Sequence, residues 1–279
     1  MIYNYSVVIP YRDKYDLFIK AVESIPDRED IQLIIVDNAP QPLDQENIPT
    51  RHLSNVVYTT SSPTKGAGCA RNKGLEYVEG KYLLFLDADD YYTPEAFPTF
   101  DKFLEKEYDL VYFNCTSIRL DDGSQSDRHN TYKQLLDGWL SNHDDLRIRY
   151  CWNVPWAKLY RSEFVLKGGF KFEEIRVHND AWFSTVTGHA AKEIYGDDTI
   201  VYVVTEGGSG QSLVKTVNKE TAFTRYCARI RINKFLKSVG RYDMHIRLLG
   251  SLKLALTKFG LKEFWRYLMY AKENGVGVL

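Results

Sequence analysis

Cysteine, methionine and long apolar runs are scarce in this sequence, which has four cysteines and three methionines among 279 residues. The cysteines (Cys69, Cys115, Cys151 and Cys227) are far apart and lack the paired spacing of structural zinc or dithiol redox sites. We therefore expect reduced, buried thiols in a cytoplasmic protein. No apolar run approaches the roughly 18 residues of a membrane-spanning helix. The opening stretch MIYNYSVVIP reads as a strand without a basic leader segment, so we expect no signal peptide.

Charge is unevenly distributed along the chain, although the net charge is only −1. Residues 219–279 contain 13 Lys and Arg against 4 Asp and Glu, whereas residues 1–218 contain 23 against 33. An acidic body with a basic C-terminal segment indicates two regions with different partners. We expect neither region to bind nucleic acid.

Strand and helix patterns alternate over residues 1–115. This alternation predicts an α/β fold with a Rossmann-like, doubly wound and mostly parallel sheet. The expected strands are 5–10, 31–37, 55–60, 82–86 and 109–115. The expected helices are 15–25 and 94–106, and residues 66–78 are expected to form a loop that passes into a helix.

The rest of the chain is less regular and more helical. Residues 116–217 predict helices at 131–141 and 179–191 and a strand at 200–204, and the stretch WAKLYRSEFVLKGG (156–169) predicts a strand followed by a helical turn. Residues 218–279 form a basic helical C-terminal extension, with expected helices at 219–238, 243–258 and 261–273.

Polar side chains stand where several predicted strands end. Pro10, Asp37 and Asp87 occupy such ends, and ligands of doubly wound sheets bind beyond the carboxyl ends of the strands. Asp87, Asp89 and Asp90 are close enough to repel one another unless water, amides or a cation offset their charges. An Asp-x-Asp pair after a buried strand suits a divalent cation that shares substrate phosphates. The alternative, a helix N-terminus near Pro94, explains Asp90 better than the other two aspartates.

Four sequence blocks occur in an order that carries a family resemblance. They are SVVIPYRDKYDLFIKAVESI, IQLIIVDN, GAGCARNKGLEYVEGKYLLFLDADDYYTPEAF and FEEIRVHNDAWF. The chain resembles family-2 glycosyltransferases with the GT-A fold, closely over residues 5–115 and loosely over 150–212. These enzymes transfer a sugar from a nucleotide diphosphate donor with inversion at the anomeric carbon.

The resemblance implies a catalytic domain at 1–217, with a nucleotide-sugar-binding half (1–115) and an acceptor half (116–217). It implies that Asp89 and Asp87 bind Mn²⁺ or Mg²⁺ and that Asp180 is the catalytic base. For Asp180, the alternative is a structural position in the first turn of a helix. The implied nucleotide-sugar-binding residues are Pro10, Tyr11, Arg12, Asp37, Asn38, Gly68, Arg71, Asp87 and Ala88.

The implied reaction moves a hexosyl or N-acetylhexosaminyl group to a glycan or lipid-linked acceptor in bacterial surface-polysaccharide biosynthesis. Asp37 would accept a hydrogen bond from the base imide, which favours a UDP-sugar. Trp182 and Trp156 are candidates for stacking on the acceptor, although such tryptophans more often pack in the core.

Two departures from the family pattern leave a second interpretation open. Asn38 replaces a frequent aspartate, and Asn179 replaces the glutamate that usually precedes Asp180 in these enzymes. A catalytically weak, glycosyltransferase-like module that binds nucleotide or glycan is therefore the alternative. A sugar nucleotidyltransferase would need a glycine-rich loop after the first strand, which IPYRDKYD lacks.

The basic segment 219–279 combines its charge with apolar helical spacing at Leu249, Leu252, Leu256, Phe259, Phe264, Trp265 and Leu268. We expect peripheral contact with the inner face of an anionic membrane. The alternatives are packing on the catalytic domain and a homodimer.

Overall fold

Short apolar runs form the buried strands at the centre of one sheet. β1 (Tyr3–Tyr11), β2 (Ile31–Asp37) and β4 (Gly80–Phe85) are buried over most of their length, as parallel strands covered on both faces should be. The computed structural model describes residues 2–46, 48–49, 55–207 and 217–278. The other strands of this sheet are β3 (Val56–Thr60), β5 (Tyr91–Tyr92), β6 (Leu110–Arg119), β7 (Lys158–Arg161) and β8 (Ile194–Glu206).

The strand order of the eight-stranded sheet is β3-β2-β1-β4-β7-β6-β8-β5. All neighbouring pairs are parallel except those that involve β7 or β5. The expected doubly wound, mostly parallel sheet is therefore confirmed, with β7 inserted antiparallel between β4 and β6. The parallel register pairs Tyr11 with Asp37, which brings the ends of β1 and β2 to the same edge of the sheet.

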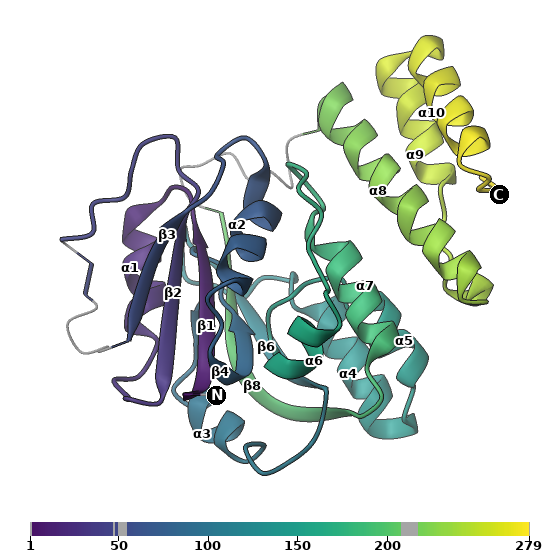
Figure 1. Cartoon of the computed structure of the whole chain (residues 1–279). Helices are drawn as coiled ribbons and strands as arrows, with labels where there is room; N and C mark the ends of the chain where they lie inside the picture. The colour runs from purple at the N-terminus through teal and green to yellow at the C-terminus, as the bar shows by residue number, and fades with distance from the viewer. Residues whose placement is uncertain (1, 47, 50–54, 208–216, 279) are drawn as a thin grey trace.

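The helices of the body cover this sheet (Figure 1). The predicted helix at 94–106 is shorter in the structure, because the backbone changes to tight i→i−3 bonds at Lys102 and Phe103. The helices are α1 (Tyr15–Glu23), α2 (Gly66–Leu75), α3 (Ala96–Asp101), α4 (Asn130–Asn142), α5 (Asp145–Cys151), α6 (Ser162–Lys167) and α7 (Asp180–Ala190).

The C-terminal extension is helical, as expected, and lies beyond α7 in Figure 1. The predicted helix at 243–258 begins later, because the Asn233 side chain bonds both the N–H and the C=O of Ile246 and holds that segment extended. No helix among the described residues is both long and apolar enough to cross a bilayer. The extension contains α8 (Lys219–Ser238), the 3₁₀ turn η1 (Tyr242–Met244), α9 (Leu249–Leu254), the π-helical turn η2 (Ala255–Phe259) and α10 (Leu261–Glu273).

Two apolar contacts organise this extension. Its helices share a small core of their own, and α8 also packs against α7 of the body through Ile232 and Leu236, which contact Ala181. The rings of Trp182 and Phe235 meet edge to face at 5.6 Å in the same contact. The extension therefore supports the helix that begins at Asp180.

Gly68 allows α2 to approach the segment that precedes α7. A Cβ at this position would lie 2.1 Å from the backbone oxygen of Glu173, a distance that no real packing permits. The glycine is therefore explained by close packing of two backbones rather than by a positive φ.

We predict that Gly68→Ala lowers the free energy of unfolding by about 1–3 kcal/mol, because the methyl group forces the two backbones apart. Gly138→Ala on α4 is the matched control, since its Cβ would meet nothing within 4 Å. That control should stabilise the protein by up to about 1 kcal/mol, as alanine does in a helix. Chemical denaturation measures both changes, and equal effects would contradict the packing explanation.

Lys158 is a buried lysine at the start of β7, and its ammonium donates to the backbone oxygen of Trp152 at 2.9 Å. Burial lowers the pKa of Lys158 well below its ordinary value, although Asp180 opposes the shift. The unfolded chain therefore holds more protons than the folded one between the lowered pKa and the ordinary value of 10.5.

The contribution of neutral Lys158 to the free energy of unfolding therefore increases with pH between these two pKa values. Below the lowered pKa this contribution is absent. We predict that the free energy of unfolding of the wild type increases relative to Lys158→Met as the pH is raised toward 10.5. Lys167→Met, an exposed lysine on α6, is the control and should show no such difference. A parallel pH dependence of wild type and Lys158→Met would contradict the prediction.

Candidate active site

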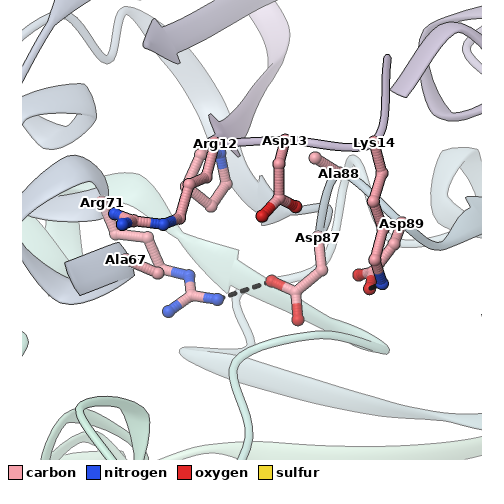
Figure 2. A pocket seen from close by; sticks show the side chains of 9 residues that line it. Arg12, Asp13, Lys14, Ala67, Arg71, Asp87, Ala88 and Asp89 are labelled. Atoms are coloured by element: carbon pink, nitrogen blue, oxygen red, sulfur yellow. Dashed lines mark hydrogen bonds and ion pairs between the residues drawn. The ribbon is translucent and has the colours of Figure 1, made fainter. Parts of the chain in front are cut away.

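Two adjoining cavities of about 180 and 270 Å³ open at the carboxyl ends of β1 and β4. Figure 2 shows the residues that line the smaller one. The larger cavity extends to the residues just before α7 and to Asp180, the first residue of that helix. Both cavities are lined by Pro10, Arg12, Ala67, Arg71, Asp87 and Asp89.

The three aspartates after β4 have three different partners. Asp87 accepts from Arg71 at 2.5 Å, whereas Asp89 accepts from Lys14 at 3.0 Å. Asp90 is buried and accepts from the Tyr202 hydroxyl and from the backbone N–H of Thr205. Burial, together with the charges of Asp89 and Asp87, raises the pKa of Asp90 well above its ordinary value. Asp90 therefore joins this loop to β8, and Asp87 and Asp89 face the cavity.

Arg71 connects the two halves of the body. Its guanidinium group donates to Asp87 and, at 3.0 Å, to the side-chain oxygen of Asn179, and only 4% of the residue is exposed. Burial opposes the charged form, but Asp87 and Asp180 outweigh it, so the pKa of Arg71 is raised. Its Nε has no hydrogen-bond partner among the described residues. A permanent positive charge thus lies at the floor of the cavity.

The predicted nucleoside side is built from the ends of β1 and β2. Tyr11, Arg12 and Asn38 line the larger cavity, and Arg12 donates to the backbone oxygen of Pro63 at 2.6 Å. Asp37 does not line either cavity, because its carboxylate accepts the backbone N–H groups of Ala39 and Leu43. The loop after β2 is therefore held in place by Asp37.

Asp180, the predicted base, is the first residue of α7 and lines the larger cavity. Its carboxylate makes no hydrogen bond to the parts of the chain that the structure describes, and it is only half-buried. His178 lies beside it in the same cavity with a φ of 63°, and burial lowers the pKa of its imidazole. Asp180 therefore presents to the cavity a carboxylate without a hydrogen-bond partner among the described residues.

Three further predicted residues, besides Asp37, lie outside the two cavities. Gly68 packs α2 against the backbone of Glu173, as described above, and does not line the cavities. Trp156 is 2% exposed and stacks on Tyr202, so neither face of its indole is free for a sugar. Trp182 packs on Phe235 of α8. By contrast, Ala88 lines the smaller cavity as expected.

Four charged residues that the sequence did not single out also line the cavities. Asp13 and Lys14 follow Arg12 directly, so the strand-end rule could have included them. Arg128 and Arg176 belong to irregular segments before α4 and α7, and no local pattern marks them. The cavities therefore contain five cationic side chains, from Arg12, Lys14, Arg71, Arg128 and Arg176.

The carboxylates suit a hard divalent cation only with help from a substrate. Among the residues described, no group of three or more His, Cys, Asp or Glu side chains is placed to hold a metal ion. Asp89 is 42% exposed and Asp87 is 26% exposed, and both supply the oxygen ligands that Mg²⁺ or Mn²⁺ prefers. One or two carboxylates that share an ion with phosphate oxygens fit this arrangement.

Comparison with known proteins places the chain in a family. The model for glycosyl transferase family 2 matches residues 6–165. YibD of Escherichia coli, an uncharacterized glycosyltransferase, is 26% identical over 245 residues, which are 85% of this chain and 71% of YibD.

Two other similarities bear on the fold and the function class. The poly(ribitol-phosphate) beta-glucosyltransferase of Bacillus spizizenii is 33% identical over 218 residues, and the alignment covers 75% of this chain but only 33% of that protein. The crystal structure of S. aureus TarS 1–349 in complex with UDP-GlcNAc superposes with a TM-score of 0.70 at 18% identity, covering 97% of this chain and 81% of TarS. The chain belongs to glycosyl transferase family 2 and has the GT-A fold.

Proposed function

We propose that the protein transfers a hexosyl or N-acetylhexosaminyl group from a UDP-sugar to a glycan or lipid-linked acceptor, with inversion. One observation carries the proposal: Asp87, Asp89, Arg71 and the half-buried Asp180 line one cavity at the carboxyl edge of the sheet. The similarity to TarS, which was crystallised with UDP-GlcNAc, supports the donor class. The similarity to a poly(ribitol-phosphate) glucosyltransferase supports a role in surface-polysaccharide assembly.

The donor would lie across the ends of β1, β2 and β4. Pro10, Tyr11 and Arg12 would contact the nucleoside, with Asn38 at the same edge. The diphosphate would meet the cationic floor at Arg71, and Arg128 and Arg176 would face it from the acceptor half. These cations would offset the two negative charges of a diphosphate that lies beside the aspartates of the same cavities.

Asp180 would act as the base of a single displacement. The acceptor hydroxyl gives its proton to the Asp180 carboxylate, and its oxygen forms a bond to the anomeric carbon. The bond from that carbon to the diphosphate oxygen breaks on the opposite face, so UDP leaves and the configuration inverts. A positioned base of this kind contributes about 10²–10⁴ in rate.

Asp89 and Asp87 would hold Mn²⁺ or Mg²⁺ together with the donor phosphates, and the ion would neutralise charge on the departing diphosphate. In this structure the Lys14 ammonium forms an ion pair with the Asp89 carboxylate. Lys14 would have to leave that oxygen when an ion binds, and its ammonium could then pair with a phosphate.

The asparagines that favoured a weak binding module have structural partners. Asn179 accepts from Arg71 and donates to the backbone oxygen of Ile175, while Asn38 donates to Ser61 and Ser62. The amides therefore hold Arg71 and the loop after β3. These contacts favour an active enzyme over the alternative module.

Asp180→Asn and Asp89→Ala should separate the two proposed roles. We predict that Asp180→Asn lowers donor hydrolysis by about 10²–10⁴ while UDP affinity changes only a few-fold. Asp89→Ala should lower both hydrolysis and Mn²⁺-dependent UDP affinity, because a ligand of the ion is lost. Calorimetry with UDP and Mn²⁺, and assays of UDP release from UDP-glucose and UDP-GlcNAc, measure these effects.

Asp137→Asn, an exposed aspartate on α4, is the control for both variants and should behave like the wild type. If Asp180→Asn retained donor hydrolysis, Asp180 would not be the base. UDP binding that is unchanged by a chelator would refute the metal-dependent donor site.

Lys14→Met should strengthen Mn²⁺ binding in the absence of nucleotide by about three- to tenfold, because a competing cation leaves a partly exposed carboxylate. UDP affinity at saturating Mn²⁺ should fall in the same variant. Lys73→Met, which removes a lysine paired with Glu76 outside the cavities, is the matched control. Electron paramagnetic resonance of free Mn²⁺ measures the binding, and an unchanged affinity would show that Lys14 does not compete for Asp89.

A further inference from the structure

The helices of the C-terminal extension use only one face to build their shared core. On α10, Tyr267 and Ala271 are each 1% exposed and pack against α8 and α9. The core is formed by Tyr226, Ile230, Leu248, Leu252, Ala255, Tyr267, Ala271 and Val276. The outward sides of α9, η2 and α10 carry exposed side chains, whereas α8 also packs on α7 of the body.

The outward face of α10 carries a second apolar stripe. Leu261, Trp265 and Met269 are spaced four residues apart, which aligns them along one side of a helix, and they are 62%, 56% and 49% exposed. Lys262 and Lys272 are exposed on the same side. A soluble helix normally shows polar side chains there.

The neighbouring helical segment repeats this composition. Leu249 and Leu256 are 53% and 43% exposed, seven residues apart, with exposed Lys253 between them. Figure 1 shows α9 and α10 side by side at the end of the molecule farthest from the sheet. We call the outward stripes of α9, η2 and α10 the outer face.

The charge of the extension favours an anionic partner for the outer face. With 13 basic against 4 acidic residues at 219–279, two extensions brought face to face would repel each other. The acidic body of a second copy could attract the extension, but its large exposed apolar residues (Ile2, Tyr77, Leu140, Leu166, Tyr195 and Ile200) lie scattered over separate elements except for two on β8. No apolar stripe on the described body therefore matches the outer face.

An anionic bilayer offers both negative charge for the lysines and an apolar interior for the stripe. Each Lys or Arg near an anionic leaflet contributes about 1 kcal/mol, and leucine, methionine and tryptophan side chains enter the boundary between headgroups and acyl chains. A polyanionic polymer would satisfy the lysines but leave the apolar stripe in water.

We propose that the outer face docks the protein reversibly on an anionic lipid surface. The apolar stripe enters the interface, and Lys253, Lys262 and Lys272 meet the lipid headgroups. This docking goes beyond the proposed reaction and does not depend on it, because no residue of the outer face lines the cavities.

The test is co-sedimentation of the full chain with phosphatidylcholine vesicles that contain or lack phosphatidylglycerol, at low and high salt. Binding should require phosphatidylglycerol and should weaken with salt. Trp265→Ala combined with Met269→Ala should reduce binding by about tenfold or more. Leu140→Ala, which removes an exposed leucine from α4, is the matched control and should bind like the wild type.

A second set of variants in the same vesicle assay reverses the charge of lysines on the outer face. Lys262→Glu with Lys272→Glu should also reduce binding, whereas Lys167→Glu on α6 should not. All these side chains are exposed, so thermal unfolding should confirm that each variant folds.

Three results would overturn the proposal. They are equal binding to neutral vesicles, loss on charge reversal but not on removal of the apolar stripe, and absence of vesicle binding. Self-association in sedimentation velocity that Trp265→Ala abolishes, without vesicle binding, would assign the outer face to a second copy.

Discussion

The buried guanidinium group of Arg71 is the contact on which the geometry of the site depends. A charge with so little access to water must be paired, and here the partners come from the end of β4 and from the segment before α7. The ring of Phe172 lies 5.3 Å from the same group. One side chain of α2 thereby joins the loop after β4 to the segment before Asp180. Loss of Asp87 would leave a buried charge uncompensated, and loss of Asn179 would leave a buried N–H donor unpaired, so both contacts oppose separation of these two segments.

The same constraint explains how three aspartates can stand so close together. Asp87 is neutralised by Arg71, and the raised pKa of Asp90 disfavours a third negative charge beside the other two. Asp89 pairs with the flexible Lys14 ammonium, and its side chain is more exposed to solvent than that of Asp87. Of the three, Asp89 is therefore the one that can change its partner at the least cost.

The fold was largely predictable because its central strands are short apolar runs and end in polar residues. Pro10 and Asp87 mark strand ends, and the structure brings them to one cavity together with Asp180. The antiparallel β7 was not predictable, since the sequence around Lys158 specifies a strand but not its neighbour or direction. Gly68, Trp156 and Arg128 show the same limit. Their surroundings come from residues distant in sequence, so the sequence could name Gly68 and Trp156 without placing them, and it did not mark Arg128.

The C-terminal helices act on the site through contacts that local sequence could not reveal. Arg231 of α8 pairs with Glu173, whose backbone oxygen faces Gly68, and Phe235 packs on Trp182 two residues after Asp180. Thus α2 and α8 pack on the segment that carries Arg176, His178 and Asp180. Because α8 also shares a core with α9 and α10, the outer face and α7 belong to one continuous set of packed helices. The basic extension is therefore part of the framework that holds Asp180 in place.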